Sequence, residues 1–218
     1  MKAIIPVKSN SERVKNKNFR RFYNDLSLLD ILIIKLTRVM DSKDIYVSCD
    51  DISAKMICDK YNVNYIERDK SLIDNDVPMS KVITEVVRSV PGEDDIVWCL
   101  VTDPLFDSYA ECFDIWNNLD KEEYDSLCVV YNFREYILDE NFEPIGFGFG
   151  KDHIPTQMLK NKYLLNNTAF FIKRQAVYDN EYYIGKKTYW YVANNISVDI
   201  DTEKEFKLAQ VLYSEVFC

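Results

Sequence analysis

Short runs of apolar residues alternate along the chain with stretches in which apolar residues recur every three or four positions. Most of the short runs are continuous, a pattern typical of strands that are buried on both faces of a sheet. The pattern predicts strands at 3–7, 45–49, 64–68, 96–101, 126–131, 169–173 and 196–200. The longer amphipathic stretches predict helices at 26–40, 51–61, 79–90, 108–119 and 206–217.

The order of these elements predicts the fold class. Strands that alternate with helices favour an α/β protein with a Rossmann-like, mostly parallel sheet flanked by helices on both faces. Ligands of such sheets bind beyond the carboxyl ends of the strands. We expect a single domain, 1–218, whose alternation is interrupted at 132–165, where three of the five glycines lie. This segment is predicted to be a hairpin excursion that contacts the substrate or forms a dimer.

Composition narrows the function classes. A formal net charge of −9 argues against a nucleic-acid-binding protein, because such domains are normally basic. The chain shows neither the pattern of a signal peptide nor an apolar run of about 18 residues, so we expect no membrane span. None of the six cysteines is spaced as C-x-x-C, which favours buried free thiols of a cytoplasmic protein over a disulfide framework. A single histidine gives little support to a histidine metal site or a Ser-His-Asp triad.

The loop after the first predicted strand concentrates positive charge within this acidic chain. Lys8, Arg13, Lys15 and Lys17 are interleaved there with serines and asparagines. Phosphate-binding loops are usually rich in glycine, so that backbone N–H groups can approach the oxygens, but this loop has none. Cationic side chains are the other device, since each charge-assisted hydrogen bond contributes about 1.5–3 kcal/mol. A solvated basic turn is the simpler explanation, but the position directly after a buried strand favours an anion site.

An acidic pair lies near the other end of the sequence. Asp199 and Asp201 are two residues apart, so on a strand both carboxylates would face the same side. Such a pair suits Mg²⁺, which takes one or two carboxylates and fills its other positions with water and phosphate oxygens. The alternative is a pair of polar residues at a helix entry, because Thr202 and Glu205 form the pattern of a capping box.

Five segments of the chain carry motifs that occur in this order in one enzyme family. IPVKSNSERVKNKN at 5–18 resembles the motif I-P-A-R-x-(G/N)-S-x-x-(L/V)-x-x-K-N, with Lys8 in place of the arginine. IYVSCDD at 45–51 resembles I-V-V-S-T-D-D, and VDIDTEKEF at 198–206 resembles a D-I-D-T-x-x-D-F ending. DVPMSKVI at 76–83 and TQMLKNKYLLNNTAFFIKR at 156–174 lie between them. Over most of its length the chain thus resembles a divergent member of the acylneuraminate (CMP-sialic acid) cytidylyltransferase family.

The resemblance implies a fold of the nucleotide-diphospho-sugar transferase type, a homodimer, and a reaction for surface glycan biosynthesis. In that reaction CTP and an acidic, sialic-acid-like (nonulosonic) sugar give a CMP-sugar and pyrophosphate, with Mg²⁺. By the same likeness, the CTP ligands would be Lys8, Asn10, Ser11, Arg13, Lys17, Asn18 and Asp76. Lys17 and Asp201 would be catalytic, Asp199 and Asp201 would hold the metal, and Gln157 and Asn167 would contact the acceptor. A sugar hydroxyl attacks phosphorus in line, so no side-chain nucleophile is required.

The stretch LVTDPLF at 100–106 departs from the family's Q-P-T-S-P-L. Leu100 replaces the glutamine, Asp103 replaces the serine, and Glu12 stands where many members have lysine. Asp103 is predicted to accept hydrogen bonds from sugar hydroxyls, with a turn-forming Asp-Pro as the alternative. Other acceptors, such as 3-deoxy-manno-octulosonate or a phosphonate, stay open, as does a catalytically inactive nucleotide-binding subunit. A glycosyltransferase is disfavoured, because only 17 residues follow Asp201.

Overall fold

The computed structural model describes residues 1–9, 11, 13–73 and 76–217. Asn10, one of the predicted CTP ligands, and Glu12 lie outside these residues. The strands are β1 (Lys2–Pro6), β2 (Ile45–Cys49), β3 (Asn64–Glu67), β4 (Ile96–Cys99), β5 (Ser126–Phe133), β6 (Lys162–Leu164), β7 (Ala169–Ile172) and β8 (Thr188–Ala193). The α-helices are α1 (Leu28–Thr37), α2 (Ser53–Tyr61), α3 (Met79–Ser89), α4 (Tyr109–Asn118), α5 (Arg174–Asn180) and α6 (Glu203–Phe217).

The strands form one sheet in the order β3-β2-β1-β4-β7-β5-β6, and β8 also pairs with β5. The pairs β1–β2, β2–β3, β1–β4 and β5–β8 are parallel, whereas β7 runs antiparallel between β4 and β5. The predicted α/β class with a mostly parallel sheet is therefore confirmed. The reversed direction of β7 was not predictable from its pattern, because a buried strand is continuously apolar in either direction.

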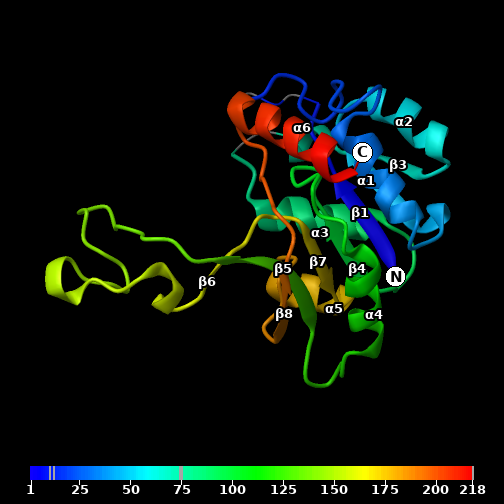
Figure 1. Ribbon diagram of the computed structural model, residues 1–218. Coiled ribbons are helices and arrows are strands. Elements are labelled where there is room, and N and C mark those ends of the chain that lie inside the picture. Colours follow the sequence, from blue (N-terminus) through cyan, green and yellow to red (C-terminus); the bar gives the residue numbers. More distant parts are fainter. Residues whose placement is uncertain (10, 12, 74–75, 218) are drawn as a thin grey trace.

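Helices cover both faces of the sheet, and each face has its own hydrophobic core (Figure 1). Side chains of α1, α2, α4 and α6 pack on the face to which Ala3 and Ile5 point. Side chains of α3 and α5 pack on the opposite face, together with Ile4. Successive residues of β1 therefore enter different cores, which explains why the strand is apolar at every position rather than at every second one.

The strand predicted at 196–200 is wrong. These residues belong to the connection between β8 and α6 and form no strand. Ile200 is nonetheless fully buried, and its N–H donates to the carbonyl oxygen of Thr102 in the loop after β4 over 2.9 Å. Its apolar character thus reflects packing beneath that loop. The last strand is β8, which the pattern missed because its residues alternate between more and less exposed positions.

A long arm leaves the body of the protein between β5 and β6 (Figure 1). Its residues 134–161, all of them described, form no α-helix or strand, only the 3-10 helices Gly150–Asp152 and Thr156–Met158. Contacts within the arm include a hydrogen bond of 3.1 Å between the Tyr136 hydroxyl and His153 Nε2. The arm falls within the hairpin excursion predicted at 132–165, whose first two residues belong to β5 and whose residues 162–164 form β6. Its use for substrate contact or dimer formation stays a prediction.

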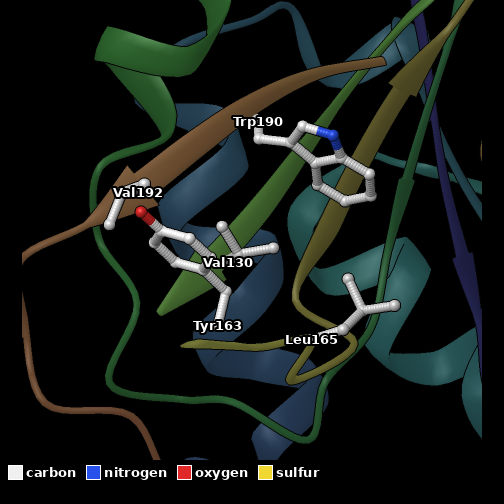
Figure 2. Close-up of a pocket in the computed structure, with 5 residues that line it drawn as sticks. All are labelled: Val130, Tyr163, Leu165, Trp190 and Val192. Carbon is white, nitrogen blue, oxygen red and sulfur yellow. The ribbon is translucent and has the colours of Figure 1, made fainter. Parts of the chain in front are cut away.

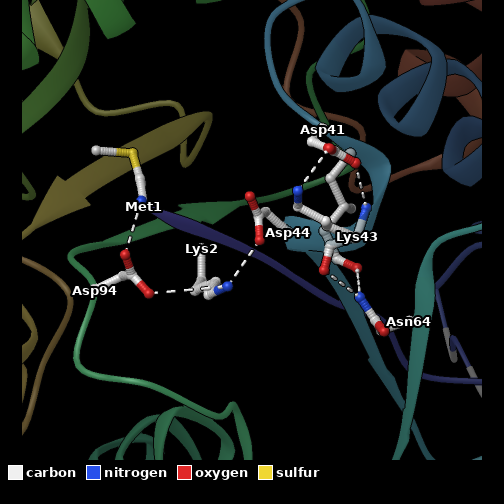
Figure 3. A network of polar contacts seen from close by, with 8 residues as sticks. Met1, Lys2, Asp41, Lys43, Asp44, Asn64 and Asp94 are labelled. Carbon is white, nitrogen blue, oxygen red and sulfur yellow. Dashed lines mark hydrogen bonds and ion pairs between the residues drawn. The ribbon is translucent and has the colours of Figure 1, made fainter.

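Charged residues fix the amino end of β1, at the opposite end of the strand from the basic loop (Figure 3). The terminal amino group lies 3.4 Å from Asp94 Oδ1, and Lys2 Nζ donates to Asp44 Oδ1 over 2.7 Å. The hydrogen bond to Asp44 outweighs partial burial and raises the pKa of Lys2. These contacts hold the start of the strand whose far end carries the predicted phosphate loop.

The cysteines behave as predicted from their spacing. Cys49, Cys58, Cys99, Cys112 and Cys128 are buried free thiols, and Cys218 lies outside the described residues. Burial raises the pKa of Cys49 to about 11 and that of Cys58 to about 12. In the part of the chain that the structure describes, no helix has the length and apolar character needed to span a membrane.

Candidate functional site

Asparagine, rather than glycine, shapes the loop of residues 8–20 that follows β1. Asn16 has a φ of +54°, a left-handed conformation that asparagine tolerates better than most residues. Its carbonyl oxygen accepts the N–H of Arg20 over 2.9 Å. Asn18 is buried, and its Nδ2 donates to the carbonyl oxygen of Lys8 over 2.9 Å. Asparagine therefore supplies both the tight turn and the closure of a loop that lacks glycine.

The two ends of the sequence meet at this loop. Arg13 Nη2 donates to Asp201 Oδ1 over 2.9 Å, and Lys17 Nζ lies 3.6 Å from the same oxygen. Lys17 Nζ also donates to the carbonyl oxygen of Ile200. Residues 188 positions apart along the chain thus share one site beyond the carboxyl end of β1.

A second set of contacts holds the start of α6 against the loop. Arg20 donates to both carboxylate oxygens of Glu203, over 2.9 and 2.8 Å, and its guanidinium lies 3.7 Å from the ring centre of Phe206. The predicted capping box is present. Thr202 N–H donates to Glu205 Oε2 over 2.7 Å, and Glu205 N–H donates to Thr202 Oγ1 over 3.3 Å. Together these contacts position the turn that contains Asp201.

Burial perturbs charged groups on both sides of the site. It lowers the pKa of Lys17, although the nearby carboxylates of Asp201 and Asp199 oppose the shift. It raises the pKa of Asp199, and the charge of Asp201 adds to that rise, while a hydrogen bond from Thr102 and the charge of Lys17 oppose it. Charged groups held partly out of water in this way are typical of functional sites.

The carboxylates fit a magnesium ion that takes most of its ligands from elsewhere. The described residues contain no group of three or more His, Cys, Asp or Glu side chains that could hold a metal. Asp199 and Asp201 provide two carboxylates from the connection before α6, and a divalent cation would offset both the burial and the repulsion that raise the pKa of Asp199. Because Mg²⁺ binds through one or two carboxylates plus water and substrate phosphates, the pair suits an ion that arrives with a nucleotide.

A cavity of about 350 Å³ opens beside Lys8, on the face of the sheet that α3 covers. Lys8 and Arg68 contribute cationic groups to its lining. Trp98, Leu100 and Tyr183 contribute apolar and aromatic walls. A concave site of this size with a few polar groups suits a small organic anion that has a flat or apolar part.

Arg68 and Asp50 belong to this site but were not predicted. Arg68 is buried, and its Nη2 donates to the carbonyl oxygen of Ser48 over 2.7 Å. Asp50 accepts the N–H of Ser9 over 2.9 Å and the Ser9 hydroxyl over 2.7 Å, which ties the loop to the end of β2. The available signal was position, because each residue directly follows a predicted or observed strand, at the edge where α/β proteins bind ligands.

The structure brings most of the predicted site residues together. Beyond β1 lie Lys8, Ser11, Arg13, Lys17 and Asn18 from the loop, with Asp199 and Asp201 from the far end of the chain. Asn167 joins them, because its side chain is close enough to Asp199 to oppose the rise in the pKa of that carboxyl. Asp76 is exposed in the turn before α3, next to Val77, which lines the cavity beside Lys8. Gln157 is exposed on the arm, which extends away from the loop (Figure 1).

Asp103 does not fit the role predicted for it. It is only 3% exposed, and its Oδ2 accepts hydrogen bonds from the hydroxyls of Tyr131, Thr168 and Ser197 over 2.6, 2.9 and 2.7 Å. The protein's own hydroxyls therefore occupy the oxygen that was expected to meet a sugar. Burial could not be inferred from the sequence, because the three hydroxyls come from distant segments.

Several solved structures share the fold of this chain. The structure is similar to a CMP:2-keto-3-deoxy-manno-octonic acid synthetase complexed with CTP, with a TM-score of 0.66 and 11% identity over 98% of each chain. It is also similar to a 4-diphosphocytidyl-2C-methyl-D-erythritol synthase from Anaerococcus prevotii, with a TM-score of 0.64 and 13% identity over 98% of this chain and 97% of the other. The fold is thus that of nucleotidyltransferases of the nucleotide-diphospho-sugar type.

The family follows from the sequence itself. The cytidylyltransferase family model matches residues 2–215, so the chain belongs to the cytidylyltransferase family. An N-acylneuraminate cytidylyltransferase from Streptococcus agalactiae is 22% identical over 210 residues, which are 93% of this chain and 51% of that relative. The chain therefore spans about half the length of the curated relative. The five motifs predicted a divergent member of this family, and the family match together with the low identity confirms that prediction.

Proposed function

We propose that the protein is a CTP-dependent cytidylyltransferase that activates an acidic, sialic-acid-like (nonulosonic) sugar to its CMP-sugar for surface glycan biosynthesis, with release of pyrophosphate. One observation carries the proposal, namely the contact of Arg13 and Lys17 with the segment around Asp201. That contact joins cations suited to a triphosphate with carboxylates suited to its metal. Family membership supports the same activity. The buried free thiols support a reducing compartment such as the cytoplasm.

The cationic loop would bind the triphosphate through two different kinds of side chain. Arg13 is 69% exposed, so it can turn from Asp201 to a phosphate oxygen at little cost. Lys17 is only 11% exposed and is held by the Ile200 carbonyl, so it provides a fixed charge for the α-phosphate and the leaving pyrophosphate. Lys8 and Arg68 would meet the nucleotide in the adjoining cavity.

The chemical step asks for alignment and charge stabilisation. The acceptor hydroxyl attacks the α-phosphorus and releases its proton to water, while the bond to the oxygen that bridges to the β-phosphate breaks in line and pyrophosphate leaves with that oxygen. Asp199 and Asp201 would hold Mg²⁺ together with phosphate oxygens and water. When bound, that ion neutralises phosphate charge and polarises the hydroxyl. Lys17 would face the charge that grows on the departing group.

The acceptor would bind on the Asn167 side of the site. The Asn167 side chain favours the charged form of Asp199, so its amide would lie near the proposed metal. Gln157 stands on the arm and would serve only the site of a neighbouring chain. The similarity to a CMP:2-keto-3-deoxy-manno-octonic acid synthetase favours that eight-carbon sugar acid as the second candidate acceptor.

A second copy of this chain is the proposed partner at the base of the arm. A cavity of about 580 Å³ lies there, lined by Val130, Tyr163, Leu165, Trp190 and Val192 (Figure 2). Tyr163 and Trp190 are each 52% exposed, so two large aromatic side chains face solvent in one apolar patch. Such patches are typical of protein interfaces. A homodimer through this surface would cover them.

Pyrophosphate release tests the proposed activity. The purified protein is incubated with Mg²⁺, one nucleoside triphosphate at a time, and a panel of sialic acids, other nonulosonic acids and 3-deoxy-manno-octulosonate. We expect release with CTP and at least one acid, and little with ATP, GTP or UTP. CTP binding without release for every acid would overturn the proposal in favour of a nucleotide-binding subunit without activity.

Two lysines of the same loop provide a matched pair of variants. Lys17→Met removes the partly buried cation that contacts the Asp201 segment and should lower turnover by about 100-fold. Lys15→Met removes an exposed cation of equal charge and should change turnover by less than about twofold. Equal losses in both variants would mean that only the net charge of the loop matters, and the assigned role of Lys17 would be wrong.

A further inference from the structure

The loop after β4 lies beneath the two segments that carry the proposed acceptor and metal residues. Its Leu100 N–H donates to the carbonyl oxygen of Thr168 over 3.0 Å, and its Thr102 carbonyl accepts the N–H of Ile200 over 2.9 Å. One short loop therefore joins both walls of the site.

Asp103 is the buried centre of that junction. Its Oδ2 accepts the hydroxyls of Thr168, Ser197 and Tyr131, while Oδ1 is buried and has no hydrogen-bond partner within the described ranges. Ser197 Oγ in turn accepts Asn166 Nδ2 over 2.7 Å, which links the two segments to each other. All three hydrogen bonds to this carboxylate are thus accepted by one oxygen, Oδ2.

Burying a carboxylate destabilises a protein core relative to an apolar side chain of the same volume. Taking a charge out of water costs several kcal/mol unless hydrogen bonds compensate it, and an apolar residue would fill the same volume without that cost. Burial accordingly raises the pKa of Asp103, although its three hydroxyl donors oppose the shift. The arrangement is therefore better explained by what the carboxylate orients than by core stability alone.

We propose that Asp103 is a positioning residue, whose single bonded oxygen fixes the two segments that carry Asn167 and Asp199. The proposal rests on the proposed function. Thr168 directly follows Asn167, whose φ of +46° must be held by its surroundings, and Ser197 lies two residues before Asp199. Outer residues that orient metal ligands in this way typically contribute 10- to 100-fold to metal affinity or activity.

The third hydroxyl provides an internal control. Tyr131 makes the shortest of the three bonds to Asp103, and its hydroxyl also lies 3.4 Å from Thr168 Oγ1, but it belongs to β5 and is adjacent in sequence to no proposed site residue. Thr168→Val, Ser197→Ala and Tyr131→Phe each remove one hydroxyl and leave Asp103 with two donors. This design avoids truncating the carboxylate itself, which would remove the shared acceptor of all three hydroxyls at once and endanger folding.

Three measurements separate a positioning role from a structural one. For Thr168→Val and Ser197→Ala we expect kcat to fall about 10-fold and Mn²⁺ binding in the presence of CTP, measured by electron paramagnetic resonance, to weaken about as much. The KM for CTP should stay within about twofold, because the triphosphate is held by the other loop. Tyr131→Phe should keep kcat and Mn²⁺ affinity within about twofold.

Hydrogen–deuterium exchange tests the geometry without any activity. Peptides covering 166–168 and 196–201 should exchange faster in Thr168→Val and Ser197→Ala than in the wild type, whereas Tyr131→Phe should speed exchange only at the end of β5. Equal effects of all three variants, or unchanged exchange in both site peptides, would overturn the proposal. A wild-type protein that releases no pyrophosphate would instead contradict the proposed function, and the exchange pattern would still decide the role of Asp103.

Discussion

Asp201→Asn separates the contribution of this residue to folding from its proposed contribution to catalysis. The substitution is isosteric and removes only the charge. In the structure the Asp201 side chain is 42% exposed, and its partner Arg13 is 69% exposed. Ion pairs this exposed contribute about 0–1 kcal/mol, and the amide oxygen can still accept from Arg13. The free energy of unfolding should therefore fall by less than about 1 kcal/mol.

The catalytic loss should be much larger. With the charge gone, the proposed metal keeps one carboxylate, and the cationic loop loses its charged partner. Replacing a charge-assisted interaction by a neutral one costs about 1.5–3 kcal/mol, and each 1.36 kcal/mol of barrier is a factor of ten. We expect turnover to fall on the order of 100-fold, with half-maximal activity at a higher Mg²⁺ concentration.

The assay pairs urea unfolding with pyrophosphate release at varied Mg²⁺. For a chain of 218 residues, a change of 1 kcal/mol corresponds to about 2–4 °C in Tm, so thermal melting provides a second check on folding. Asp59→Asn is the control, because Asp59 forms an exposed ion pair with Lys55 within α2 over 2.8 Å. Unchanged turnover in Asp201→Asn would remove the metal assignment. Loss of the folded state would refute the argument from exposure.

Two further predictions concern the fold and the assembly. Asp30→Asn should lower the free energy of unfolding in urea by about 2 kcal/mol, because the buried Asp30 carboxylate caps α1 and accepts Lys60 Nζ over 2.8 Å. Burial opposes the shift, but hydrogen bonds from Lys60 and Ser27 hold the pKa of Asp30 below its usual 3.8. The stability that the carboxylate contributes is therefore present above pH 3.8 and is lost as the pH falls through the lower pKa of the folded state. If the stability advantage of the wild type over Asp30→Asn does not shrink in that pH range, the assignment is contradicted. Trp190→Arg should convert the proposed dimer to a monomer in sedimentation equilibrium, since it places a charge in the apolar patch; a wild type that is already monomeric would contradict the interface.

The strands that form the centre of the sheet could be predicted because they are covered on both faces. β1, β2 and β4 enter two cores at successive positions, so their apolar runs are continuous and distinctive. The strand β8, which pairs with β5, is not covered in this way. β8 has mixed exposure, and residues 196–200 are apolar because they lie under the loop after β4, not because they pair in the sheet.

Some residues of the candidate site could be predicted from the sequence and others could not. The basic loop and Asp201 could be predicted because each belongs to a run of residues with a recognisable order, and the structure places them in contact. Arg68 and Asp50 were missed because each acts singly, through hydrogen bonds to Ser48 and Ser9. The signal for them in the sequence was their position at the end of a strand.

The absence of glycine from the phosphate loop changes how the proposed site must work. A glycine-rich loop presents backbone N–H groups that are fixed by the fold, whereas side chains must be held in place or lose entropy when a ligand binds. Here Lys17 is held by the Ile200 carbonyl, and Arg13 is held by Asp201. The far end of the chain therefore pairs with two cations of the loop, Arg13 and Lys17.

That pairing determines the cost of opening the site. Because the Arg13–Asp201 pair is exposed, breaking it should cost only about 0–1 kcal/mol. Each new charge-assisted hydrogen bond to phosphate should contribute about 1.5–3 kcal/mol of binding free energy. The exchange also frees the Asp201 carboxylate for the metal at the moment when Arg13 turns to the nucleotide. Binding of nucleotide and metal should consequently be mutually reinforcing, so CTP should tighten Mn²⁺ binding by the same factor by which Mn²⁺ tightens CTP binding. Titration calorimetry in both orders measures that factor, and independent binding of the two would show that the ion pair does not lie on the path to the bound state.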